Sequence, residues 1–81
     1  MIEKAEKLLK ALYGELTLEL LDFTHTGTCT RVMFFGLSDS KFYVVRYNYR
    51  GNRYDVDVFE AAQVTNSYSE LEVREMLNGQ D

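Results

Sequence analysis

The sequence predicts an α+β domain in which a helix at each end of the chain flanks a four-stranded antiparallel sheet. The length of 81 residues is enough for one domain and too short for two. A hydrophobic fraction of 46% is too high for a disordered chain. The spacing of apolar residues changes from a helical period to a period of two, and then back to a helical one. We therefore expect a single domain over residues 1–81 with the element order α-β-β-β-β-α.

The N-terminal segment, residues 2–13, is predicted to be an amphipathic helix. Ile2, Ala5 and Leu9 recur at helical spacing. Two glutamates in the same segment each precede a lysine by four positions, which is the favourable order for ion pairs on a helix. Gly14 then occupies the position at which glycine commonly ends a helix.

Four segments with the alternation or composition of strands follow this helix. The first begins at Glu15, where leucines alternate with polar residues, and ends at a polar loop over residues 24–28. The other three are expected at residues 29–37, 42–50 and 53–60, with turns at 38–41 and at Gly51-Asn52. A two-residue turn that contains glycine and asparagine is typical of a tight hairpin.

A second helix is expected at the C-terminus. Ser67 and Glu70 have the spacing of a capping box, in which the two side chains satisfy backbone N–H groups of the first turn. The apolar residues Val73 and Met76 follow on one side of this helix. Gly79 is expected to end it.

The tight turn at residues 51–52 also predicts how the strands pair. It sets Tyr49 opposite Tyr54, Tyr47 opposite Val56, Val45 opposite Val58 and Arg46 opposite Asp57. The same reasoning carried back along the chain places Phe34 beside Val45, and Leu20 beside Val32. One face of the resulting sheet is nearly all apolar, so both the core and the helices are expected there. Its members are Leu16, Leu18, Leu20, Val32, Phe34, Val45, Tyr47, Tyr49, Tyr54, Val56 and Val58.

The other face carries an apolar patch toward one end of the last three strands. This apolar patch consists of Met33, Phe35, Leu37, Phe42, Val44 and Phe59. The charged rim around it consists of Arg46, Arg50, Asp55 and Asp57. A monomer rarely leaves such a patch in water. Either the C-terminal helix crosses the sheet to cover it, or the patch and rim form an interface with a second copy or a target protein.

The expected function is non-enzymatic protein binding, by a small cytoplasmic regulator or inhibitor that forms a homodimer or binds a target. Nine basic and thirteen acidic residues give a net charge of −4 and a pI of about 4.9, which disfavours bare nucleic acid as the partner. No segment approaches the roughly 20 apolar residues of a membrane-spanning helix. A single cysteine, Cys29, excludes an intramolecular disulfide.

The alternative function is binding of single-stranded nucleic acid by the third strand and its hairpin. Basic and aromatic residues interleave there, as they do on sheets that stack bases and hold phosphates. The basic residues of this alternative are Lys41, Arg46, Arg50 and Arg53. Strand periodicity opposes it, because Tyr47 and Tyr49 fall on one face while Arg46 and Arg50 fall on the other.

Residues that carry catalytic chemistry are sparse. His25 and Cys29 are the only histidine and cysteine, and Asp22 is the nearest carboxylate that could orient the histidine. These three residues fall short of a four-ligand zinc site. The chain also contains neither a GxGxxG nor a GxxxxGK[ST] motif. We therefore expect no catalytic site, no metal, no cofactor and no small-molecule substrate.

In size, acidity and element order the chain is similar to two loose groups of proteins. One comprises small, acidic, phage-encoded inhibitors of bacterial defence systems. The other comprises short bacterial proteins of unknown function that contain a helix, a sheet meander and a final helix. The similarity involves no diagnostic residue, so it assigns no site.

Overall fold

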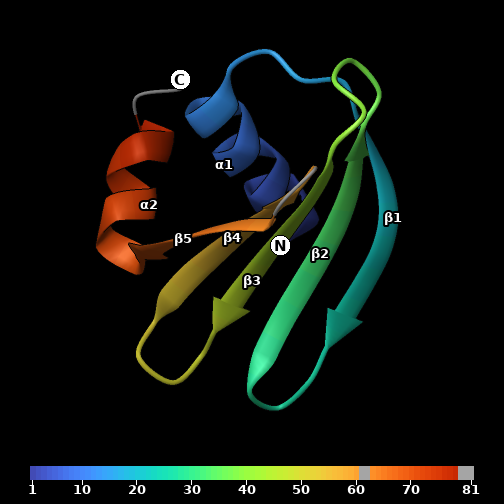
Figure 1. The fold of residues 1–81 in the computed structure, drawn as a ribbon. Coiled ribbons are helices and arrows are strands. Elements are labelled where there is room, and N and C mark those ends of the chain that lie inside the picture. Colours follow the sequence, from blue (N-terminus) through green and yellow to red (C-terminus); the bar gives the residue numbers. More distant parts are fainter. Residues whose placement is uncertain (61–62, 79–81) are drawn as a thin grey trace.

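The structure, a computed structural model, describes residues 1–60 and 63–78, and residues 63–65 by their backbone alone. Its elements in chain order are α1 (Ile2–Tyr13), β1 (Leu18–His25), β2 (Cys29–Gly36), β3 (Phe42–Asn48), β4 (Arg53–Phe59), β5 (Gln63–Ser69) and α2 (Glu70–Asn78). One sheet contains the strands in the order β1-β2-β3-β4-β5, and every neighbouring pair is antiparallel (Figure 1). The predicted α+β class is confirmed, with five strands in place of four.

The first helix forms where the sequence predicts it. Lys10 Nζ lies 3.1 Å from Glu6 Oε1, which is one of the ion pairs expected from the four-residue spacing. Gly14 ends the helix with a φ of 85°, a left-handed conformation that favours glycine, and its N–H donates to the Lys10 carbonyl at 2.9 Å. The local signals of this segment are therefore sufficient to set both its bounds and its type.

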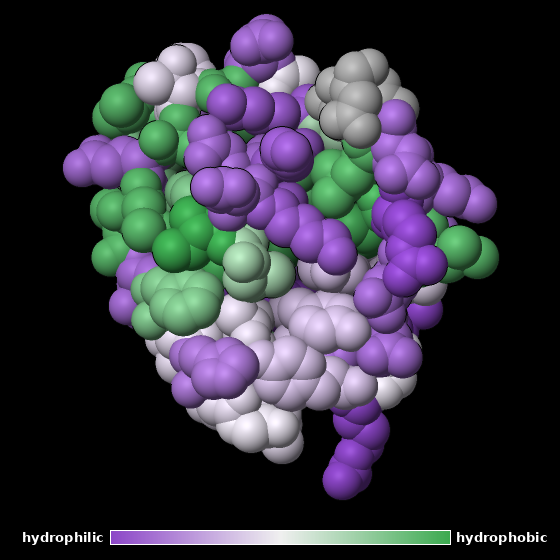
Figure 2. All heavy atoms as spheres, turned by 180° about the vertical axis from the view of Figure 1, so that it is seen from behind, coloured by the Kyte–Doolittle hydropathy of each residue, from purple (hydrophilic) through white to green (hydrophobic). Residues whose placement is uncertain are grey.

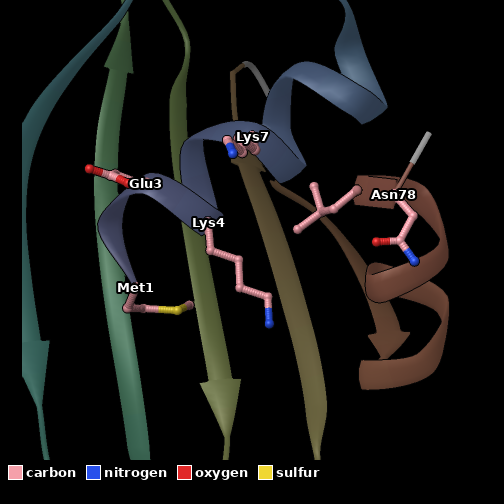
Figure 3. Close-up of a pocket in the computed structure, with 6 residues that line it drawn as sticks. Met1, Glu3, Lys4, Lys7 and Asn78 are labelled. Atoms are coloured by element: carbon pink, nitrogen blue, oxygen red, sulfur yellow. The ribbon is translucent and has the colours of Figure 1, made fainter. Parts of the chain in front are cut away.

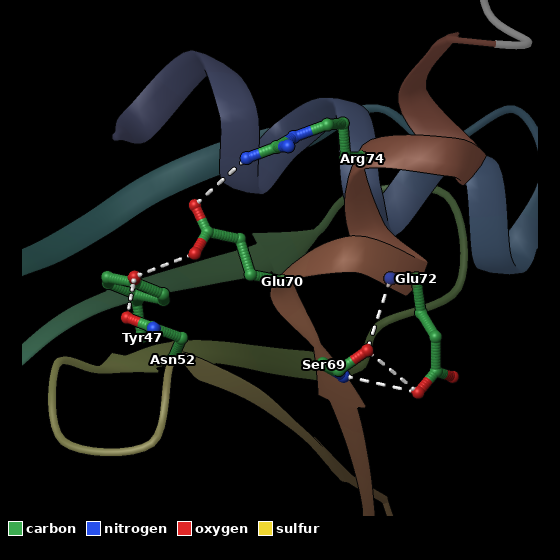
Figure 4. Close-up of polar contacts among 6 residues, drawn as sticks. All are labelled: Tyr47, Asn52, Ser69, Glu70, Glu72 and Arg74. Carbon is green, nitrogen blue, oxygen red and sulfur yellow. Dashed lines mark hydrogen bonds and ion pairs between the residues drawn. The ribbon is translucent and has the colours of Figure 1, made fainter.

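The C-terminal part of the chain differs from the prediction. Residues that were expected to start a helix at Ser67 instead extend β5, which pairs with β4. The capping box lies one half-turn later, at Ser69 and Glu72. The Glu72 N–H donates to Ser69 Oγ at 3.2 Å, and the Ser69 N–H and hydroxyl reach Glu72 Oε1 at 3.4 and 3.0 Å (Figure 4). The expected end at Gly79 lies outside the described residues.

The hairpin turns are longer than predicted, so the strand pairs shift. The β3–β4 turn spans residues 49–52, which sets Tyr47 opposite Tyr54 rather than Val56. The β2–β3 pairing shifts in the same way and sets Val32, not Phe34, opposite Val45. Each shift is two residues. Because side chains alternate with a period of two, the predicted pairs are wrong while the predicted faces are retained.

The first strand starts later and runs further than predicted. It begins at Leu18 and continues through His25, so only residues 26–28 remain as the turn. The pairing with β2 shifts by one residue between Leu20 and Asp22, which is a β-bulge. Beyond the bulge, Phe23 is opposite Val32 and His25 is opposite Thr30. The bulge therefore turns Phe23 and His25 toward the apolar face of the sheet.

The core lies between that apolar face and the helices. Its buried members are Ala5, Leu8, Leu9, Val32, Phe34, Tyr43, Val45, Tyr54, Val56, Val58 and Val73. Leu16, Leu18 and Tyr47 pack against it as predicted. Leu20 departs from the prediction, because it lies on an edge strand and is 45% exposed.

The C-terminal helix packs on the same face as α1 and does not cross the sheet. Val73 of α2 is fully buried in the cluster that contains Ala5 and Leu8 of α1. Figure 1 shows α2 beside α1. The alternative in which α2 covers the opposite face is therefore wrong, and we call that opposite face the open face.

Candidate functional site

The open face brings together most of the apolar patch predicted from the sequence. Phe35 of β2 is opposite Phe42 of β3, and Phe42 is opposite Phe59 of β4, so three phenylalanines form a row across three strands. The rings of Phe35 and Phe42 lie 5.0 Å apart between centroids at an angle of 56°. Met33 and Val44 are opposite each other in the adjacent part of the face. Strand alternation explains why all five residues point the same way.

The members of the patch differ in how much solvent they meet. Phe42 and Phe59 are exposed at 44% and 37%, whereas Met33 and Phe35 are half-buried. Val44 is only 4% exposed, so it forms the floor of the patch and cannot be an accessible contact. Leu37 lies past the end of β2, where its N–H donates to the Thr17 carbonyl at 2.8 Å.

One ion pair lies inside the patch rather than around it. Arg46 Nη2 is 2.9 Å from Asp57 Oδ2, although Asp57 is directly opposite Val44. The contact is therefore diagonal, a geometry that long side chains on neighbouring strands can reach. Asp57 is 4% exposed, while the Arg46 side chain remains 34% exposed. The buried Asp57 carboxylate therefore lies next to Val44, and the Arg46 guanidinium balances its charge.

The other members of the charged rim lie further away. Asp55 accepts a hydrogen bond from Asn48 Nδ2 at 2.7 Å, toward the turn between β3 and β4. Arg50 is exposed within that turn, at the opposite end of β3 from Phe42. The structure therefore does not bring Arg50 to the apolar patch, because the longer turn moves it out of the strand.

The sequence reasoning missed an ion pair that adjoins the phenylalanine row in the sequence and, by strand alternation, belongs to the opposite side of the sheet. Lys41 Nζ lies 3.3 Å from Glu60 Oε2, immediately beyond the opposed residues Phe42 and Phe59. The signal was present in the sequence, because unlike charges follow the two phenylalanines. It was hidden by the two-residue error in the predicted pairing of β3 and β4.

The basic residues of the nucleic-acid alternative are dispersed. Lys41 and Arg46 are in the ion pairs described above, and Arg53 Nε donates to Ser67 Oγ at 3.1 Å. Arg50 and Lys41 flank opposite ends of β3. Tyr47 is on the helix-covered face, opposite in direction to Arg46. The structure thus does not gather these cations and aromatic rings on one surface.

The histidine and cysteine point to opposite faces of the sheet. His25 is opposite Thr30, whereas Cys29 precedes Thr30 on the same strand and so alternates to the open face. His25 Nδ1 lies 2.9 Å from Thr30 Oγ1 and 2.8 Å from the Tyr49 hydroxyl. Asp22 instead contacts Arg31 at 3.6 Å. Within the described ranges, no three His, Cys, Asp or Glu side chains are grouped as a metal site would require.

The helix side of the molecule carries an open pocket between the two helices. It has a volume of about 380 Å³ and is lined by residues of α1 and the end of α2, among them Lys4, Lys7 and Asn78 (Figure 3). Figure 3 shows the Lys4 side chain extending away from Lys7 across the helix side of the sheet. The two ammonium groups therefore do not converge on one point in this pocket.

Comparisons with protein-family models, with curated proteins and with solved structures find no match to this chain. In the described part of the chain, neither helix has the length and apolar character needed to cross a membrane.

Proposed function

We propose that this protein is a non-enzymatic protein-binding module that acts through the open face of its sheet. The observation that carries the proposal is the placement of both helices on one face, which leaves the row of Phe35, Phe42 and Phe59 without a covering element among the described residues. Exposed aromatic rings beside ion pairs are typical of the centre and rim of a protein interface.

The size of a stable interface indicates how much of the face takes part. Such interfaces bury roughly 800 Å² on each partner. This is about a sixth of the 5025 Å² of accessible surface on the chain. Three phenylalanine rings are too few to supply that area, so the partner also contacts neighbouring residues of the open face, among them Met33 and the Arg46–Asp57 pair.

The partner that best fits this surface is a second copy of the chain. On this face Arg46 and Asp57 form an ion pair at 2.9 Å. Because this face carries both signs of charge, with Glu19 opposite Phe35, a second copy can place its Arg46 near that carboxylate, although the whole chain carries a net charge of −4. A target protein that covers the same face is the other form of this proposal. It includes the role of a small cytoplasmic inhibitor, such as a phage counter-defence protein.

The test replaces an exposed ring of the patch and compares it with an exposed apolar residue elsewhere. Phe42→Asp adds a charge to the patch, and Leu71→Asp adds one to α2, where Leu71 is 61% exposed. We expect the parent chain and Leu71→Asp to show twice the 9.4 kDa monomer mass by light scattering. Phe42→Asp is expected to be monomeric with an unchanged circular dichroism spectrum, because the exposed side chain contributes little to folding.

Two results would count against the proposal. If the parent chain is monomeric and the rings of Phe35 and Phe42 are protected from solvent, the patch is part of the core. If Leu71→Asp disrupts association as strongly as Phe42→Asp, the interface lies on the helix side. A chain retained on single-stranded DNA at low salt and released by added salt would favour the nucleic-acid alternative instead.

A further inference from the structure

A second surface, on the helix side of the sheet, has a different character from the open face. A pocket of about 370 Å³ lies where α1 leaves the ends of the strands uncovered. Five of the residues that line it carry rings: Phe23, His25, Tyr47, Tyr49 and Tyr54. Figure 2, which views the molecule from the helix side, shows pale ring-bearing side chains gathered below a band of hydrophilic residues.

The rings form a continuous wall because of the observed strand register. Tyr47 and Tyr54 are opposite each other on β3 and β4, with ring centroids 4.6 Å apart. Tyr49 lies 5.4 Å from Tyr47 and 5.8 Å from the His25 ring. The bulge in β1 turns both Phe23 and His25 to this side. The pocket therefore exists only with the bulge and with the pairing that the longer hairpin turn imposes.

Hydrogen bonds at the ring edges hold this wall in place. The Tyr47 hydroxyl donates to Asn52 Oδ1 at 2.9 Å, and Glu70 Oε2 lies 3.4 Å from the same hydroxyl (Figure 4). The Tyr49 hydroxyl contacts both His25 Nδ1 and the hydroxyl of Thr30, which is a buried residue. Rings fixed at their edges lose little conformational freedom when a ligand binds, which favours binding.

The charges at the pocket indicate which ligand it suits. Lys4 Nζ lies 5.4 Å from the centroid of the Tyr54 ring, within the range of a cation–π contact. The chain thus already places one ammonium group on this wall. Glu70 lines the same pocket, and its other oxygen is 3.6 Å from the largely exposed Arg74 guanidinium. Such a long, exposed ion pair is weak, so the carboxylate is available to a competing cation.

We infer that this pocket binds a small organic cation with a methylated ammonium group. An aromatic wall attracts a positive charge through the negative faces of its rings. The ring faces themselves offer no conventional hydrogen-bond acceptor, so a methylated ammonium, which is weakly hydrated, loses less against them than a primary amine does. The site is on the opposite side of the sheet from the apolar patch, and the inference does not depend on the proposed protein interface.

The test compares two probes of the same shape that differ in charge. Choline carries a trimethylammonium group, and 3,3-dimethyl-1-butanol replaces its nitrogen by carbon. We expect choline to shift the ring NMR signals of Tyr47, Tyr49 and Tyr54 to saturation, with a dissociation constant on the order of millimolar. The neutral analogue is expected to cause no saturable shift. Tyr13 and Tyr68, which do not line the pocket, serve as internal controls in the same spectra.

Variants sharpen the test because Lys4 competes with the ligand. Lys4→Met should strengthen choline binding by about two- to fivefold, since it frees the Tyr54 face and removes a like charge. Tyr49→Leu should weaken binding by about threefold or more. Tyr13→Leu removes a tyrosine outside the pocket and should leave the affinity unchanged. Circular dichroism spectra confirm that each variant is folded.

Three outcomes would overturn the inference. Equal shifts with the neutral analogue would show an apolar pocket that does not recognise charge. Weaker choline binding by Lys4→Met would show that the lysine supports the ligand rather than competing with it. Saturable binding of adenosine monophosphate without binding of choline would identify the pocket as a site for a nucleobase and its phosphate.

Discussion

Tyr43 is a residue whose acid–base behaviour is strongly changed by folding. Its side chain is buried in the core, and its hydroxyl donates to Asp39 in the turn after β2. Burial and the contact with the Asp39 carboxylate together raise the pKa of Tyr43 above its ordinary value of 10.0. A neutral phenol is compatible with this site. A phenolate there would lose its hydration and would be repelled by the Asp39 carboxylate.

The raised pKa of Tyr43 makes stability depend on alkaline pH. In the unfolded chain the phenol ionises near pH 10, but in the folded chain it keeps its proton to higher pH. Its contribution to the free energy of unfolding is therefore complete below about pH 10 and is lost as the pH rises above that value. Urea denaturation at several pH values should show a smaller alkaline loss for Tyr43→Phe. Parallel losses in the variant and the parent chain would show that Tyr43 is not responsible.

Glycine is required at Gly36, the last residue of β2, because the turn that follows approaches it closely. A methyl group at this position would collide with the Asp39 carboxylate and lie 3.1 Å from the Tyr43 ring. We expect Gly36→Ala to lower the free energy of unfolding by about 1–3 kcal/mol, because a crowded site must shift to accept the extra atom. Gly27→Ala is the matched control, since an added methyl there meets no atom within 4 Å. Equal melting temperatures for the two variants would contradict this account.

At the scale of elements, the start of α2 is decided between two overlapping signals. The segment SYSELE contains two capping boxes, Ser67 with Glu70 and Ser69 with Glu72. The structure uses the second, because residues up to Ser69 pair with β4. Local sequence alone cannot choose between them, since the choice depends on a strand that is distant along the chain.

The choice of capping residue can be measured directly. Ser69→Ala removes the acceptor of the Glu72 N–H and should lower the free energy of unfolding by about 1 kcal/mol. The loss is felt by the whole fold because α2 supplies Val73 to the core. Ser67→Ala, at the position that the sequence favours, should change stability by less than about 0.5 kcal/mol. The reverse order of effects in thermal denaturation would place the cap at Ser67.

At the scale of the whole molecule, the sheet is stabilised unevenly across its width. β3 and β4 are central and contribute buried residues to the core, whereas seven of the eight residues of β1 are exposed. Leu20, Leu21 and Phe23 on this edge strand are each exposed at 44% or 45%. Regions with little buried apolar surface open more readily than the core does.

Hydrogen exchange should reveal this gradient. We expect amides that bond β1 to β2 to exchange faster than those that bond β3 to β4, because opening β1 exposes little new apolar surface. Two-dimensional NMR after transfer to deuterated water measures both sets in one experiment. Equal protection across the sheet would mean that β1 unfolds only with the rest of the domain.

The sequence by itself determined the fold class, the first helix and the two faces of the sheet. These features follow from the periods of 3.6 and two residues, which depend only on local backbone geometry. The apolar patch was predictable for the same reason, since a two-residue error in pairing leaves Phe35, Phe42 and Phe59 on their face.

Only the tertiary structure decided the fifth strand, the β1 bulge, the length of the turns and the placement of α2. Each of these depends on contacts between residues far apart in the sequence, which no local period contains. The pocket of rings was therefore hidden from sequence reasoning, although the tyrosines were recognised as sharing a face. Tertiary contacts also decided that the open face carries no helix among the described residues. Burying Val73 beside Ala5 and Leu8 places α2 on the helix side of the sheet.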